Sequence, residues 1–167
     1  DWCYLAIPCE KTKVVKITQA LRLMNCKGLN ITIPHKQEIV TTCAKLTAIA
    51  EEIQAVNTLI PVEKNQWIGA NTDVEGFLMP LSNQDLTNKN AVVIGCGGSA
   101  RAVVMGLSTL KLKHITVIAR NQNSLNLFIN DMKNLSTNNT PIEGINNEKS
   151  NVKTFIEESS LIINTTP

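Results

Sequence analysis

Lys36 and Asp73 are the two residues of this sequence whose types best suit the transfer of a proton. Each follows an apolar, strand-like stretch, NITIPH before Lys36 and WIGANT before Asp73. Because ligands of open α/β sheets lie beyond the carboxyl ends of the strands, both side chains could meet in one crevice with Thr32 and Asn57. Asp73 would then hold the ammonium of Lys36, which would give a proton to a substrate oxygen. The plainer interpretation is a surface lysine and an aspartate that caps the helix after it.

The stretch AVVIGCGGSARAV, residues 91–103, has the pattern of a dinucleotide-binding loop. An apolar strand leads into Gly95-x-Gly97-x-x-Ala100, and a helical pattern follows. Gly95 would permit the tight turn, Gly97 would let the backbone approach a pyrophosphate, and Ala100 would let the helix pack closely on the strand. Free N–H groups at the start of the helix would face the anion. The alternative is a glycine-rich turn that binds no nucleotide.

The end of the next strand, HITVIAR, indicates which dinucleotide is bound. Asp or Glu at this place binds the ribose 2′-hydroxyl of NAD, whereas Arg accommodates the 2′-phosphate of NADP. The sequence has Arg120 there and no acidic residue before Asp131. NADP is therefore the predicted cofactor, against the alternative that Arg120 is a solvated surface cation. For Arg101 two roles stay open, a contact to phosphate and simple exposure to solvent.

Strand-like and helix-like segments alternate along the chain, which predicts an α/β fold. In the second half this alternation predicts a parallel sheet with right-handed crossovers. In the first half a polar turn at 63–66 is expected to return one strand directly into the next. The polar connector 82–90 predicts two lobes, residues 1–85 and 86–167. In the first lobe the predicted strands are 3–7, 29–33, 55–62 and 67–71. The predicted helices are 14–24, 37–43, 48–53 and 74–81, and we expect Gly28 to end the first of them. In the second lobe the predicted strands are 91–94, 115–119 and 161–163, the helices are 99–110, 124–135 and one near Phe155, and a polar loop reaches residue 150.

Composition narrows the class of partner. The chain has 167 residues, 43% of them hydrophobic, and a formal net charge of +2 without a polybasic block, which argues against nucleic acid and anionic membrane. No stretch approaches the roughly 18 apolar residues of a membrane span. The five cysteines are odd in number and contain no CxxC pair, so they predict neither a metal site nor a disulfide framework, but reduced thiols in a cytoplasmic protein. We expect a small-molecule substrate.

The motifs NITIPHK, AVNTL, NTDVEGF and GCGGSARA, the strand that ends at Arg120, and NTTP occur in this order. In this combination the chain resembles the shikimate dehydrogenases, NADP-dependent oxidoreductases of aromatic amino-acid biosynthesis, from Leu5 to Pro167. The resemblance implies an N-terminal substrate-binding α/β lobe and a Rossmann-like NADP-binding lobe with a parallel sheet. It also implies the reversible, NADPH-dependent reduction of 3-dehydroshikimate to shikimate on the route to chorismate, with a homodimer as the candidate assembly.

The resemblance assigns roles by matching motif positions. Lys36 looks like the acid/base of the family and Asp73 like its partner at the substrate's hydroxyls, while Thr32 and Asn57 are similar to the substrate-binding residues. Arg120 matches the contact to the 2′-phosphate. The remaining matches lie in the pyrophosphate loop and near the nicotinamide: Gly95, Gly97, Gly98, Ser99 and Ala100 in the loop, and Asn164 and Thr166 near the nicotinamide. His35, next to Lys36, is not expected to take part directly.

The chain departs from the family pattern in several places. Ala119-Arg120-Asn121 stands where the family has Asn-Arg-Thr, and Ser124 stands where a second arginine is frequent, which weakens the expected preference for NADP. The family's N-terminal strand with a Ser-x-Ser substrate clamp has no counterpart before Asp1, and its C-terminal segment with a substrate-binding glutamine has none after Pro167. We therefore expect a piece of a longer enzyme that is weakly active or inactive by itself.

Three other functions compete with this one. A quinate or shikimate dehydrogenase that uses NAD would place an acid where Arg120 stands. A non-catalytic paralogue that senses dinucleotide would have lost the pair of Lys36 and Asp73. A generic dinucleotide-binding module leaves the NITIPHK stretch unexplained.

Overall fold

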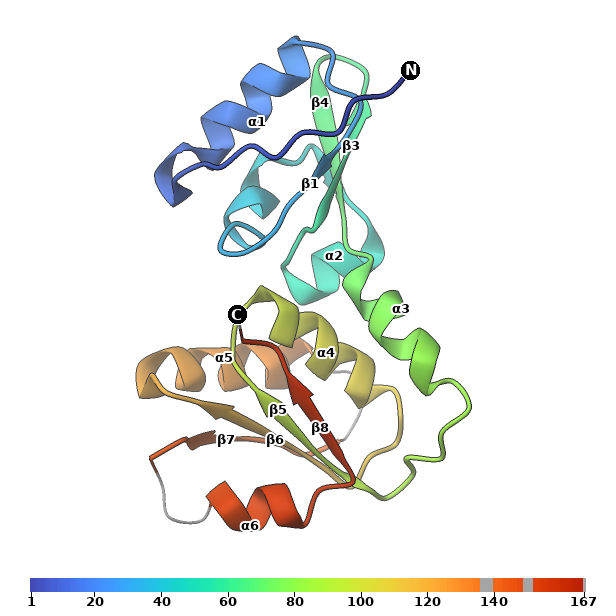
Figure 1. The fold of residues 1–167 in the computed structure, drawn as a ribbon, viewed down its shortest axis with the longest axis vertical. Helices are drawn as coiled ribbons and strands as arrows, with labels where there is room; N and C mark the ends of the chain where they lie inside the picture. The colour runs from blue at the N-terminus through green and yellow to red at the C-terminus, as the bar shows by residue number, and fades with distance from the viewer. Residues whose placement is uncertain (136–139, 149–151, 167) are drawn as a thin grey trace.

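The structure, a computed structural model, describes residues 1–135, 140–148 and 152–166 and shows two four-stranded sheets, one in each predicted lobe (Figure 1). Pro167 and parts of the predicted polar loop, 136–139 and 149–151, lie outside these residues. The α/β class predicted from the sequence is confirmed. None of the helices in the described ranges combines the length and the apolar character that a membrane span requires.

The first sheet has the order β1-β3-β4-β2 and is mostly antiparallel, and its β3-β4 hairpin agrees with the polar turn predicted between strands 55–62 and 67–71. The hairpin is tight, because Lys64 and Asn65 take φ values of 57° and 56° and turn the chain directly from one strand into the next. Only β2 and β4 run parallel. The strands are β1 (Leu29–Asn30), β2 (Lys45–Leu46), β3 (Thr58–Val62) and β4 (Gln66–Ala70).

Helix α1 (Val14–Leu23) packs its apolar face against this sheet, after a 3-10 turn at Lys11–Lys13. Val14 is buried, and Trp67 of β4 donates its ring N–H to the carbonyl of Thr18 at 3.0 Å. The helix ends before the predicted Gly28, because Asn25 already adopts the left-handed conformation, with φ of 60°. The prediction that Gly28 ends this helix is therefore wrong.

Three other predictions for this lobe need correction. No strand forms at residues 3–7, where Tyr4 and Leu5 are 83% and 71% exposed, because no described strand pairs with this extended segment. The predicted strand 29–33 pairs only as β1, although the N–H of Ile31 still donates to the carbonyl of Asn57 at 2.7 Å. The predicted helix 37–43 is a 3-10 helix, Glu38–Thr42.

The second sheet is entirely parallel, in the order β7-β6-β5-β8, as the alternation of strands and helices predicts. Helices α4 and α5 cover one face, and α6 lies on the other (Figure 1). The elements are β5 (Asn90–Ile94), α4 (Gly98–Ser108), β6 (His114–Ala119), α5 (Gln122–Leu135), β7 (Ile142–Asn146), α6 (Val152–Glu157) and β8 (Leu161–Asn164).

Strand β7 lies within the predicted polar loop, so the prediction of a loop is wrong for these residues. Its sequence IEGIN carries only two buried apolar side chains, Ile142 and Ile145. Gly144 lies directly beneath α5, where an added Cβ would approach Ile129 to 2.8 Å and Leu125 to 2.9 Å. A glycine at such a close approach looks like a turn signal in the sequence.

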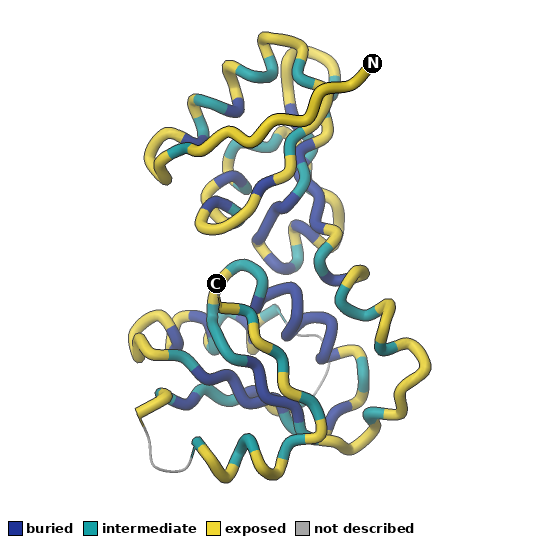
Figure 2. Tube along the Cα trace, in the orientation of Figure 1, coloured by how far each residue is buried: buried dark blue, intermediate teal, exposed yellow. Residues whose placement is uncertain are grey.

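The larger hydrophobic core crosses from one lobe to the other. It joins residues of β5, β6 and α4 to Ile53 and Ala55, near the end of α2 (Ala48–Ile53), and to Val74 of α3 (Asp73–Leu78), which a 3-10 turn at Met79–Leu81 continues. Figure 2 shows buried residues along the second sheet, along α4 and where the two lobes meet. The division after residue 85 separates the two sheets but not this core, and it stays a prediction.

Candidate active site

The side chains of Lys36 and Asp73 meet where the two lobes adjoin. The ammonium Nζ of Lys36 donates to Oδ2 of Asp73 at 2.8 Å and to Oγ of Ser99, in the second lobe, at 2.9 Å. The side chain of Lys36 is 12% exposed and that of Asp73 is 31% exposed, so the pair is shielded but reachable from solvent. A charge-assisted hydrogen bond at this depth is stronger than one on an open surface.

Asp73 is held by the residues around it and does not act as a helix cap. Thr72 occupies the N-cap position of α3, and the N–H of Asp73 donates to Oδ1 of Asn71 at 2.9 Å. The other carboxylate oxygen, Oδ1, accepts from Nδ2 of Asn57 at 2.7 Å. The capping interpretation of Asp73 is therefore wrong. The carboxylate instead joins an asparagine on one side to a lysine on the other.

Asn57 connects the ends of two segments. Its Nδ2 also donates to Oγ1 of Thr72 at 3.0 Å, and its Oδ1 accepts from the N–H of Thr72 at 3.1 Å and from Oγ1 of Thr58 at 2.8 Å. Asn57 is buried, with 9% of its surface exposed, so these bonds satisfy a polar group that would otherwise be costly to bury. Its described bonds show Asn57 as a residue that orients Asp73; a contact to substrate stays a prediction.

The backbone of Lys36 is fixed as well as its ammonium. Its carbonyl accepts from the N–H of Val56 at 2.8 Å. Its aliphatic stem runs along the glycine loop, where a Cβ added to Gly98 would lie 3.0 Å from Cβ and 3.3 Å from Cδ of Lys36. Lys36 therefore reaches across Gly98 to Ser99, and a residue larger than glycine would displace it.

The glycine loop has the conformation that dinucleotide binding requires. Gly95 has φ of 108°, which favours glycine, and Gly97 is extended at the N-cap of α4 with no atom within 4 Å of a built Cβ. Both glycines line a cleft of about 670 Å³, together with Arg120 and Thr166 among others. Ala100 is fully buried, as close packing of the helix on the strand demands.

Arg120 and Thr166 both line this cleft. Arg120 is exposed and forms no ion pair with any residue in the described ranges. Both the N–H and the hydroxyl of Thr166 donate to Oδ1 of Asn164, at 3.0 Å and 2.6 Å. A second hollow, lined by Asp73, Ser99, Asn164 and Thr166 among others, lies beside the acid/base pair. Thr166 lines both hollows, which places the predicted nicotinamide segment next to Asp73.

Arg101 has neither of the roles left open for it. It is 4% exposed, donates from Nε to the carbonyl of Ile53 at 3.1 Å, and pairs with Asp131 of α5 at 2.7 Å. Burial lowers the pKa of the Arg101 guanidinium, which the charge of Asp131 partly offsets. Arg101 is therefore a buried side chain that connects α4 to α2 and α5. No local pattern identifies its partners, which lie 48 and 30 residues away in the sequence.

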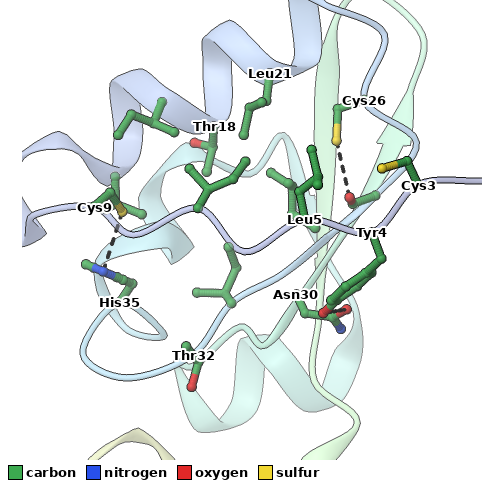
Figure 3. Close-up of a pocket in the computed structure, with 16 residues that line it drawn as sticks. Cys3, Tyr4, Leu5, Cys9, Thr18, Leu21, Cys26, Asn30, Thr32 and His35 are labelled. Atoms are coloured by element: carbon green, nitrogen blue, oxygen red, sulfur yellow. Dashed lines mark hydrogen bonds between the residues drawn. The ribbon is translucent and has the colours of Figure 1, made fainter.

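His35 and Thr32 line a groove beside α1 and the N-terminal segment rather than the acid/base pair (Figure 3). His35 is buried and its Nε2 lies 3.6 Å from Sγ of Cys9, which fits the expectation that His35 takes no direct part. The carbonyl of Thr32 accepts a hydrogen bond from the N–H of His35 at 2.9 Å. Its side chain is not hydrogen-bonded to Lys36 or Asp73, and its contact to substrate stays a prediction.

Known proteins resemble the chain along its whole length. The shikimate dehydrogenase substrate binding domain family matches residues 1–59. The shikimate dehydrogenase (NADP(+)) of Prochlorococcus marinus strain MIT 9515 is 48% identical over 171 residues, which cover 100% of this chain and 57% of that protein. The chain thus spans a little over half the length of the curated relatives it matches.

Solved structures show the same fold. Shikimate dehydrogenase from Aquifex aeolicus is 26% identical and superimposes with a TM-score of 0.78, over 95% of this chain and 55% of that one. Quinate dehydrogenase from Corynebacterium glutamicum in complex with NAD is 25% identical, with a TM-score of 0.77 over 92% of this chain and 54% of that one. Sequence and structure agree that the chain is similar over its whole length to shikimate dehydrogenases, of which it spans a little over half.

Proposed function

We propose that the complete protein catalyses the reversible, NADPH-dependent reduction of 3-dehydroshikimate to shikimate in aromatic amino-acid biosynthesis. The observation that carries this proposal is the shielded pair of Lys36 and Asp73 lying directly beside the glycine loop. Reduction of a ketone needs a hydride on carbon and a proton on oxygen. In this proposal the second lobe holds the donor of the hydride, the first lobe supplies the proton through Lys36, and both act where the two lobes adjoin.

The residues of the second lobe fit a dinucleotide. The positive φ of Gly95, the open space at Gly97 and the free start of α4 suit a pyrophosphate, and exposed Arg120 at the same cleft suits a 2′-phosphate. When bound, NADPH would supply the hydride for the substrate carbon. The curated relative described above has NADP(+) in its name, which agrees with the prediction of NADP from Arg120.

The residues of the first lobe supply the proton. Lys36 is the general acid for the substrate oxygen in the reducing direction and the base in the oxidising direction. Asp73 keeps the ammonium in place through its Oδ2, while Asn57 fixes the opposite oxygen of the same carboxylate. Thr32, Asn57 and Asp73 are the proposed contacts to the hydroxyls of the substrate.

Two further parts of the proposal concern the assembly of the protein and its location. A homodimer is supported by the family resemblance alone, and sedimentation of the complete protein would test it. A cytoplasmic location is supported by the five cysteines, which are all unpaired in the structure.

The deciding experiment measures NADP-dependent oxidation of shikimate by the complete polypeptide and three variants. We expect Lys36→Ala to lower kcat by about two to four orders of magnitude, the range of general acid–base catalysis, and Asp73→Asn to lower it strongly. Lys16→Ala removes an exposed lysine of α1 and serves as the control with normal turnover. Near-normal turnover of both Lys36→Ala and Asp73→Asn would disprove the assigned chemistry.

A further inference from the structure

The ammonium of Lys36 can donate only a limited number of hydrogen bonds. A lysine ammonium carries three N–H donors. One is directed to Oδ2 of Asp73 at 2.8 Å and a second to Oγ of Ser99 at 2.9 Å. With two donors fixed at their acceptors, the direction of the third is fixed as well. That third donor is the one available to a substrate oxygen.

Ser99 is well placed to fix this direction because its own position is rigid. It is the second residue of α4, and from Ala100 to Ser108 every residue of that helix is buried. Arg101, two residues further on, binds α2 and α5. The hydroxyl of Ser99 thus comes from the second lobe, whereas Asp73 holds the same ammonium from the first. The lysine is oriented only while the two lobes are in contact.

We propose that Ser99 is a positioning residue for Lys36, in addition to its place in the glycine loop. This inference rests on the proposed function and assigns Ser99 a task in proton transfer. A hydroxyl that accepts from the ammonium keeps its own O–H as a donor. Ser99 can therefore hold Lys36 and at the same time donate to an anionic group bound at the loop, which links occupancy of the nucleotide site to the orientation of the acid.

Steady-state kinetics of the complete polypeptide distinguish this task from nucleotide binding. For Ser99→Ala we expect kcat to fall about tenfold, the effect of one hydrogen bond to a charged group, in addition to any rise in the KM for NADP from the lost donor to the anion. Ser99→Thr restores a hydroxyl and should recover most of the loss. The matched control is Ser108→Ala, because Ser108 is a buried hydroxyl of the same helix whose only hydrogen bond within the described residues goes to the carbonyl of Val104. A raised KM for NADP with unchanged kcat would overturn the proposal.

A second measurement decides the proposal even if the protein does not oxidise shikimate. Wild type, Ser99→Ala and Ser108→Ala are treated with limiting formaldehyde and cyanoborohydride, and methylation of Lys36 is quantified by peptide mass spectrometry. Loss of the Ser99 acceptor frees the ammonium, so labelling of Lys36 should rise several-fold in Ser99→Ala and stay at the wild-type level in Ser108→Ala. Equal labelling in all three proteins would refute the inference. Absence of turnover in wild type would refute the proposed function alone.

Discussion

Two adjacent glycines, Gly97 and Gly98, have different surroundings and should fail in different ways when replaced. A Cβ on Gly98 would press on Cβ and Cδ of Lys36, whereas a Cβ on Gly97 would enter only the open space of the cleft. In the complete enzyme we expect Gly98→Ala to lower kcat about tenfold by displacing Lys36, with the KM for NADP little changed. Gly97→Ala should instead raise the KM for NADP. The prediction fails if both variants show the same pattern of kcat and KM.

Arg120 should decide between the two nicotinamide dinucleotides. Its exposed side chain lines the cleft, and a guanidinium binds phosphate through charge-assisted hydrogen bonds. Arg120→Ala should raise the KM for NADP about tenfold, the cost of roughly 1.4 kcal/mol, and leave the KM for NAD unchanged. Lys113→Ala, which removes another exposed cation, should alter neither constant. An equal rise of both KM values would contradict an interaction with the 2′-phosphate.

At the scale of elements, Arg101 ties three helices together, and the effect of removing it should appear in stability. Arg101→Ala loses the bond to the carbonyl of Ile53, the pair with Asp131 and buried packing volume. We expect the free energy of unfolding in urea to fall by about 2–4 kcal/mol. The matched control is Lys153→Ala in α6, because Lys153 and Glu157 form an exposed pair at 3.6 Å that should contribute less than about 0.5 kcal/mol. Similar losses of unfolding free energy in both variants would show that Arg101 does not hold the three helices together.

Elements whose boundaries are set by local residues could be predicted from the sequence. Helix α2 matches its predicted range because Thr47 caps its start, accepting from the N–H of Ala50 at 3.4 Å, and Gln54 leaves it in the left-handed conformation. Two segments whose state depends on a partner strand, and not on their own apolar pattern, could not be predicted. Residues 3–7 have the composition of a strand without a described partner, and β7 is recognisable only beside β6.

The same distinction applies to the site. Lys36 and Asp73 could be paired from sequence because each follows a strand-like stretch, and strand ends gather polar groups at one edge of a sheet. The bonds from Lys36 to Ser99 and from Arg101 to Ile53 span 63 and 48 residues. They depend on how the two lobes meet, which no periodicity or motif in the chain specifies.

At the scale of the whole molecule, the second lobe depends on the first for part of its core. Phe77 and Leu78 of α3 lie within 3.1 Å and 3.3 Å of a Cβ built on Gly106, so α3 packs closely against α4. A peptide of residues 86–167 would expose the face of α4 around Gly106, against which Phe77 and Leu78 pack in the intact chain. Each large apolar side chain left uncovered forgoes about 1.5–3 kcal/mol.

We therefore expect residues 86–167 to unfold at a lower temperature than residues 72–167, which keep α3, and to bind more of an apolar dye such as ANS. Both peptides lack Ile53, so they differ only in the linker and in the helix that covers α4. Thermal unfolding followed by circular dichroism would measure the difference. If the two peptides melt alike, α3 adds nothing to the core of the second lobe. The two lobes would then be held together by Ile53 and Ala55 in the shared core and by the hydrogen bonds of Ser99 and Arg101, without a contribution from α3.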